Sequence, residues 1–241
     1  MKGFTELGKI FEVKSRDESS NARTAVLKTN HGAIQTPVFM PVGTRGSVKG
    51  LTPDQITETG SQIILANTYH MMLRPGADIV AELGGLHKLM AWDKPILTDS
   101  GGYQVFSLNT LNKINDNGVE FASHIDGKKY MLGPKDSIGI QNKLGADIIM
   151  AFDECTPFPC PEDRLKTAVE RSIRWAEQSL NAHDREEQLL FGIVQGGIDL
   201  DLRSRCAEEL VSMDFPGYAI GGLSVGEGHK NMIRAVNHTA P

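Results

Sequence analysis

The chain has 241 residues, 40% of them hydrophobic and 23% charged, with three cysteines and a net charge of −5. These values are ordinary for a soluble globular protein, and no apolar run approaches the roughly 18 residues that a membrane helix needs. The acidic balance excludes a general attraction to nucleic acid, so any RNA contact would need a local basic surface or a contribution from outside this chain. No signal peptide opens the sequence and the cysteine number is odd, so we expect a cytoplasmic protein with reduced thiols and no membrane partner.

The N-terminal stretch alternates polar and apolar residues, which predicts an antiparallel layer over residues 1–35. From residue 36 onward, continuous apolar runs alternate with helical patterns. Runs of this kind are typical of parallel strands that are covered on both faces. The expected strands and their ends are Thr36–Gly43, Gln62–Asn67, Pro95–Gly102, Asp147–Glu154, Leu190–Gly197 and Gly217–Ser224.

One segment interrupts this alternation. Within residues 107–134, Asp126-Gly127 separates two alternating runs, which predicts a hairpin insertion. The sequence contains no internal repeat and no linker rich in serine or proline. We therefore expect a single domain over residues 1–241, with the N-terminal layer followed by about six βα units over residues 36–241.

The number of units leaves two architectures open. A closed (β/α)₈ barrel takes about 250 residues, so the length is nearly sufficient for one. Six βα units do not close an eight-stranded barrel. The fold is therefore either an open, doubly wound α/β sheet or a barrel whose remaining units lie outside this chain.

Polar residues and glycines gather at the ends of the predicted strands. In parallel sheets these carboxyl ends meet at one edge, where ligands bind. Carboxylates and carboxamides together with exposed backbone N–H groups suit a planar ligand with donors and acceptors, such as a purine, although each residue alone could be a helix cap. The residues at these ends are Asn67, Asp99, Asp153, Gln195, Gly221 and Gly222.

Two other kinds of site do not match the sequence. "GGLSVGEGHK" resembles a phosphate loop, but Glu227 follows Gly226 where that motif requires lysine. Zinc takes about four ligands, and the cysteines Cys155, Cys160 and Cys206 lack partners at zinc-site spacing. We expect no metal site within this chain.

Several long stretches resemble the bacterial tRNA-guanine transglycosylases, also called queuine tRNA-ribosyltransferases. They occur in the family's order and include "TPVFMPVGT", "ANTYHMMLRPG", "LTDSGGYQVFSL", "DIIMAFDECTPFP", "FGIVQGG" and "MDFPGYAIGGLSVGE". The resemblance implies a TIM barrel with an N-terminal antiparallel sheet, bound zinc and a cytoplasmic homodimer. It also implies exchange of the wobble guanine in tRNAs with a GUN anticodon for the 7-deazaguanine preQ1, in queuosine biosynthesis.

The resemblance assigns roles to individual residues. The family reaction is a double displacement at ribose C1′, as in retaining glycosidases, and Asp99 matches the carboxylate that takes a proton from the incoming base. Asp153 matches the carboxylate that reads the guanine N–H edge. Cys155 and Val225 match the bacterial pattern that favours preQ1. The further substrate-binding residues are Ser100, Gly101, Gly102, Tyr103, which stacks on the base, Gln195 and Gly222, which hold its O6, and Leu223.

The resemblance also predicts what the chain lacks. The family's nucleophilic aspartate and its zinc ligands match no residue up to Pro241. We therefore expect the 241-residue chain alone to be inactive in base exchange. Two alternatives stay open: a non-catalytic base-binding subunit or fragment of the same family, and an unrelated barrel enzyme acting on a small sugar phosphate.

Overall fold

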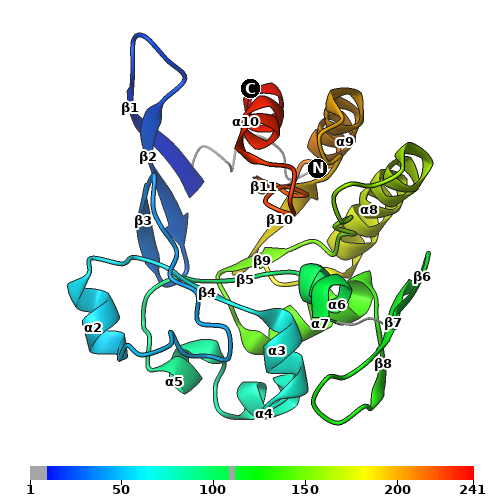
Figure 1. The fold of residues 1–241 in the computed structure, drawn as a ribbon. Helices are drawn as coiled ribbons and strands as arrows, with labels where there is room; N and C mark the ends of the chain where they lie inside the picture. The colour runs from blue at the N-terminus through cyan, green and yellow to red at the C-terminus, as the bar shows by residue number, and fades with distance from the viewer. Residues whose placement is uncertain (1–9, 109–111) are drawn as a thin grey trace. The chain divides into compact units, whose positions relative to one another are not determined.

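The computed structural model describes residues 10–108 and 112–241, and these divide into two compact units (Figure 1). Unit 1 consists of the described residues of Met1–Asp99 together with Ile140–Ile149 and Arg185–Leu189. Unit 2 consists of the described residues of Ser100–Gly139, Met150–Asp184 and Leu190–Pro241. Each unit is therefore assembled from three separate segments of the chain.

Unit 1 begins with a three-stranded antiparallel sheet, drawn in blue in Figure 1. Its strands are β1 (Phe11–Arg16), β2 (Arg23–Thr29) and β3 (Gly32–Thr36). Ala25 of β2 and Ile34 of β3 are its buried residues, and most of the remaining side chains are exposed or half-buried. The sheet lies in the predicted N-terminal layer, of which residues 1–9 are outside the described residues.

Short parallel strands form the second part of unit 1. β4 (Ile64–Ala66) pairs in parallel with β5 (Ile96–Thr98), and Leu97 of β5 pairs with Ile148 of β9 (Ile148–Met150). These strands are buried almost throughout, as expected for continuous apolar runs. The helices around them are α2 (Pro53–Glu58), α3 (Thr68–Leu73), α4 (Ala77–Glu82) and α5 (Leu86–Met90).

The prediction of a strand over Thr36–Gly43 was wrong. The segment contributes one isolated parallel bridge, between Val42 and Leu65, in place of a strand. Pro37 and Pro41 lack the N–H groups that a regular ladder requires, although the Pro41 carbonyl still accepts a hydrogen bond from Leu65. The described residues therefore contain five parallel strands, β4, β5, β9, β10 and β11, and not the predicted six.

Unit 2 contains a second antiparallel sheet, in the predicted insertion. Its strands are β6 (Asn112–Asn115), β7 (Gly118–Ala122) and β8 (Lys129–Leu132). The Asp126 carboxylate accepts from the Lys128 N–H, and Gly127 has φ +73°, so Asp126-Gly127 forms the expected turn. Residues 109–111 of this insertion lie outside the described residues.

The remaining elements of unit 2 are helices and two parallel strands. β10 (Leu189–Val194) pairs with β11 (Gly217–Ile220), and the Ala151 N–H after β9 donates to the Phe191 carbonyl. Figure 1 shows α9 packed between α8 and α10. In the described part of the chain, no helix combines the length and apolarity needed to cross a bilayer. The helices are α6 (Gly102–Leu108), α7 (Pro134–Leu144), which continues into unit 1, α8 (Glu162–Ala182), α9 (Leu200–Ser212) and α10 (His229–Thr239).

Candidate functional site

A buried carboxylate, a carboxamide and a hydroxyl meet at strand ends in unit 2. Asp153 follows β9 by three residues, Gln195 comes directly after β10, and Ser100 precedes α6. The Ser100 hydroxyl donates to Asp153 Oδ1 at 2.8 Å, and Gln195 Nε2 donates to Oδ2 at 2.6 Å. Each of the three is at most 7% exposed. Both oxygens of this carboxylate are thus bound by neutral donors.

Helix α8 fixes the backbone on both sides of Asp153. The Phe152 N–H donates to Ser179 Oγ at 3.1 Å, and the Glu154 N–H donates to Ser172 Oγ at 3.0 Å. The two serines are seven residues apart, so they lie on the same face of the helix. Our sequence reasoning missed them. The available signal was a serine at each of two positions in an otherwise apolar stripe.

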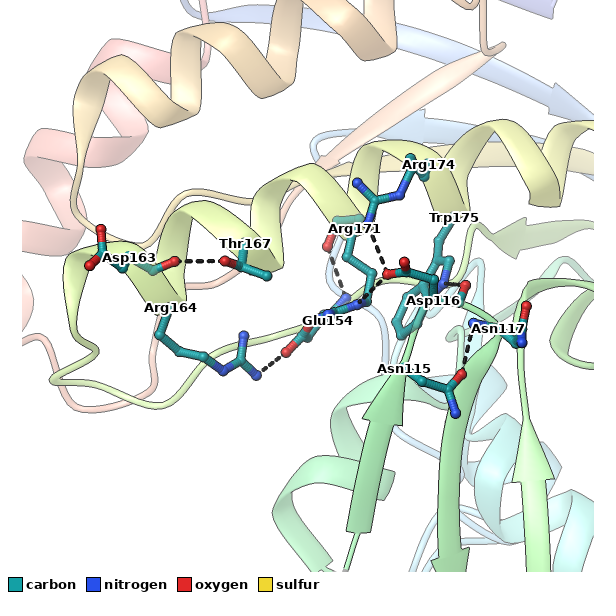
Figure 2. Close-up of polar contacts among 11 residues, drawn as sticks. Asn115, Asp116, Asn117, Glu154, Asp163, Arg164, Thr167, Arg171, Arg174 and Trp175 are labelled. Carbon is teal, nitrogen blue, oxygen red and sulfur yellow. Dashed lines mark hydrogen bonds and ion pairs between the residues drawn. The ribbon is translucent and has the colours of Figure 1, made fainter.

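The next residue, Glu154, has different partners (Figure 2). Its side chain is fully buried and pairs with Arg164 and, at 2.5 Å, with Arg171. Arg174 binds the carboxylate of Asp116 at 2.9 Å, in the β6–β7 turn. Two guanidinium groups therefore neutralise Glu154, and α8 is attached to the hairpin sheet. This arrangement indicates a structural role for Glu154.

Glycines allow the backbone to approach these polar side chains closely. A Cβ at Gly102 would lie 2.6 Å from the Asp153 carbonyl oxygen. Gly222 has φ +65°, and a Cβ there would lie 2.4 Å from Gln195 Oε1. Substitution at either position would displace a side chain or the backbone of the cluster.

Asp99 lies in unit 1 at the end of β5. Its side chain accepts hydrogen bonds from Asn67 Nδ2 and, at 2.8 Å, from the Thr68 N–H, both at the end of β4. The Thr68 hydroxyl donates to the Asp99 carbonyl at 2.5 Å. Asp99 is half-buried. It is therefore a carboxylate of fixed orientation that keeps access to solvent.

The structure brings five of the predicted residues together in unit 2. Ser100, Gly102, Asp153, Gln195 and Gly222 form one cluster in unit 2. The remaining residues are Gly101, which is buried with φ +81°, Tyr103, which is 51% exposed, half-buried Leu223, and Asp99 in unit 1.

Neither thiol near the cluster is suited to nucleophilic chemistry. Burial, together with the charge of Asp153, raises the pKa of Cys155 to about 12. Burial also raises the pKa of Cys206 to about 11. Both groups are therefore protonated at neutral pH, whereas a cysteine nucleophile reacts as the thiolate.

Within the described residues, one group of three side chains has metal-ligand chemistry: His31, His87 and Asp147 of unit 1. The two imidazole rings are stacked, with centroids 3.5 Å apart and planes 16° from parallel. A histidine binds a metal through a lone pair that lies in the plane of its ring. The lone pairs of two nearly parallel rings point along separate planes, so they do not meet at one ion at the 2.0–2.1 Å typical of zinc–nitrogen bonds. Instead, Nδ1 of His31 lies 2.9 Å from Oδ1 of Asp147, and Nε2 of His87 lies 3.1 Å from Oδ2. The described residues therefore do not fit the zinc that the family resemblance implies.

The fold and the cluster define an α/β protein in which a carboxylate, a carboxamide and a hydroxyl meet at strand ends. Residues 17–241 match the model of the TGT family, described as queuine tRNA-ribosyltransferase. The chain belongs to this family. The predicted family is thereby confirmed.

Similar proteins carry the name queuine tRNA-ribosyltransferase. The protein of Pelotomaculum thermopropionicum is 54% identical over 231 residues, which are 96% of this chain and 62% of that protein. The protein of Caldanaerobacter subterraneus subsp. tengcongensis is 56% identical over 230 residues, 95% of this chain and 61% of that protein. The chain thus spans about 60% of the length of these relatives.

Proposed function

We propose that the protein acts as a tRNA-guanine transglycosylase, replacing the wobble guanine of GUN-anticodon tRNAs with preQ1 by double displacement at ribose C1′. The observation that carries the proposal is the buried Asp153 carboxylate, held at strand ends by Ser100 and Gln195, in a chain of this family. Because tRNA is the proposed substrate, we expect the reaction to take place in the cytoplasm. Zinc, homodimer formation and TIM-barrel closure are expectations from the family resemblance.

In the proposed base complex, Asp153 accepts hydrogen bonds from the guanine N–H edge. Each carboxylate oxygen has two lone pairs, so Asp153 can keep its bond from Ser100 while it binds the base. The Gln195 amide then turns its N–H₂ group toward the base carbonyl. Hydrogen bonds to a charged group are shorter and stronger than neutral ones, so Asp153 supplies most of the recognition.

We assign Asp99 the role of proton acceptor. In the first displacement a carboxylate attacks C1′ and guanine leaves with the electrons of the C1′–N9 bond. In the second, the incoming base gives its N9 proton to Asp99 and attacks C1′, which releases the first carboxylate. Asn67 and Thr68 hold Asp99 in one orientation for this transfer. We assign the attacking carboxylate to none of the described residues.

The test is incorporation of labelled guanine into a tRNA with a GUN anticodon, by this chain supplied with the segment that carries the attacking carboxylate, since we expect the 241-residue chain alone to be inactive. We expect Asp99→Asn to reduce incorporation by roughly 10²–10⁴-fold, since the variant keeps the shape but loses the proton acceptor. A tRNA with another wobble base serves as the control. Incorporation that is unchanged by Asp99→Asn would contradict the assignment.

One outcome distinguishes the alternative within the family. If the protein binds guanine but incorporates none with either tRNA, it is a base-binding subunit or fragment, not the catalytic one. The match to the TGT family over residues 17–241 excludes the other alternative, an unrelated barrel enzyme acting on a small sugar phosphate.

A further inference from the structure

A fully buried arginine of α9 joins two loops at the ends of parallel strands in unit 2. Arg203 is 0% exposed. Its Nε donates to the Gly197 carbonyl at 2.6 Å, and its Nη2 donates to the Gly221 carbonyl at 2.9 Å. Gly197 lies two residues after Gln195, and Gly221 directly precedes Gly222. The guanidinium therefore connects the two loops that carry predicted base-binding groups.

The same helix face contacts Gln195 itself. Cys206 is three residues after Arg203, which places both on one face of α9. The Gln195 N–H lies 3.3 Å from Cys206 Sγ, as a hydrogen-bond donor. A Cβ at Gly196 would lie 2.7 Å from Arg203 Cγ and 2.8 Å from the Arg203 backbone nitrogen. Gly196 thus provides the space in which α9 approaches this loop.

The charge of Arg203 is favoured through space by the carboxylate of Glu227, but within the described residues no carboxylate is in direct contact with it. Buried charges are normally paired with an opposite charge. Within the described residues, no carboxylate forms an ion pair with Arg203, and its buried Nη1 has no hydrogen-bond partner. Two carbonyl groups bind the guanidinium instead. A methionine or leucine would fill the space without this desolvation, so packing alone does not explain an arginine.

We propose that Arg203 is a positioning residue of the base site. By binding the carbonyls of Gly197 and Gly221, it fixes the positions of Gln195 and Gly222 relative to each other. This inference rests on the proposed function, because it assigns the two loops to guanine. Arginine suits the role because its planar fork binds two acceptors at once, whereas a lysine ammonium is a single point of charge.

The experiment compares Arg203→Met, Arg203→Lys and Arg205→Met with the unaltered protein. Arg205 is the matched control, since it lies on the same helix, is half exposed and pairs with Glu170. Two quantities are measured: the dissociation constant for guanine by calorimetry, and hydrogen–deuterium exchange in peptides covering residues 194–198 and 220–224.

We expect Arg203→Met to weaken guanine binding about tenfold or more, in proportion to the loss of two charged hydrogen bonds. Exchange should become faster in the two loop peptides and stay unchanged in the hairpin sheet and in α8. Arg203→Lys should recover part of the affinity, because it restores the charge and one donor. Arg205→Met should match the unaltered protein in both measurements.

Unchanged exchange in both loop peptides of Arg203→Met would overturn the proposal, and so would faster exchange throughout unit 2, which indicates a purely structural role. If Arg203→Met does not fold, Arg203→Lys decides: full guanine affinity with unchanged loop exchange would overturn the proposal. If the unaltered protein binds no guanine, the proposed function fails. Loop-confined exchange in Arg203→Met would then still show that Arg203 holds the two loops.

Discussion

Two buried aspartates lie at opposite ends of the same strand and are held in opposite ways. Asp147 directly precedes β9, in unit 1, and Asp153 follows β9, in unit 2. Their exposed fractions are 2% and 7%, so burial does not distinguish them. The difference lies in their partners.

Asp147 is bound by groups that fix the fold. It accepts from the backbone N–H groups of Ile96 and His31, each at 2.9 Å, and it faces ring nitrogens of His31 and His87. These partners come from the start of β5, the β2–β3 turn and α5. A carboxylate with backbone donors and two imidazoles cannot release them without disturbing three elements.

Asp153 is bound by a hydroxyl and a carboxamide. Both donors are neutral side chains at loop ends, although the Ser100 hydroxyl also accepts a hydrogen bond from the Gly102 N–H at 3.1 Å. From this comparison we expect that the acid held by backbone N–H groups and imidazoles serves the fold, whereas the acid that accepts from a hydroxyl and a carboxamide exchanges a partner for a ligand. Substituting each acid tests this rule.

The largest effect is expected for guanine binding in Asp153→Asn. The substitution removes the charge from a pair of hydrogen bonds, each worth about 1.5–3 kcal/mol, so we expect affinity to fall by roughly 10²-fold or more with little change in thermal stability. Asp147→Asn should show the reverse, with lower stability and normal affinity. Calorimetry and thermal unfolding of both variants measure this, and equal loss of guanine affinity in the two would refute the distinction.

Acid sensitivity is the next largest effect. Burial opposes the charged form of Asp147, but the hydrogen bonds from His87, Ile96 and His31 outweigh it and lower the pKa from 3.8 to about 2. A pKa below the unfolded value means that the carboxylate stabilises the fold above about pH 4, and that this contribution disappears as the pH falls toward 2. We expect a loss of about 2 kcal/mol over that window.

Unfolding by urea at several pH values measures this loss, and Asp147→Asn is the control. The difference in free energy of unfolding between the unaltered protein and Asp147→Asn should shrink by about 2 kcal/mol as the pH falls from about 4 to 2. The cavity beside Asp147 is also lined by Lys88, Arg185 and Glu187, whose contributions are present in both proteins and cancel. A difference that is constant with pH would contradict the depressed pKa.

The smallest effect is expected for Ser100→Ala. The substitution removes one neutral donor to Asp153, which is worth about 1 kcal/mol, so guanine affinity should fall by roughly fivefold. Ser137, whose hydroxyl donates to the Ser100 carbonyl, offers a control that leaves Asp153 untouched. An effect of Ser100→Ala as large as that of Asp153→Asn would mean that the serine, not the charge, governs binding.

The sequence predicted the strand-end residues because their pattern is local. Asn67, Asp99, Asp153 and Gln195 each follow an apolar run, so neighbouring residues in the sequence are enough to place them at strand ends. The Asp126-Gly127 turn was predictable for the same reason, because its residues define the turn type. The strand expected at Thr36–Gly43 does not form because Pro37 and Pro41 lack the N–H groups that its hydrogen bonds would need.

The supporting residues were not predictable because their partners are distant in sequence. Arg203 and Arg171 look like surface charges on amphipathic helices, and only the fold shows that they are enclosed. Likewise, Gly221 and Gly222 after β11 suggested exposed N–H groups for a ligand. The structure shows that they also make room for Gln195, and that Gly196 after β10 makes room for Arg203.

The three-segment construction of unit 1 has a consequence for synthesis of the chain. Its last segment, Arg185–Leu189, follows the first two segments of unit 2. During translation, unit 1 therefore stays incomplete until residue 189 has left the ribosome, by which time much of unit 2 has already emerged. Domains made of one continuous segment fold one after another as they appear, N-terminal first. These two units must instead mature together, and the nascent chain depends on contacts of long sequence separation, which form slowly.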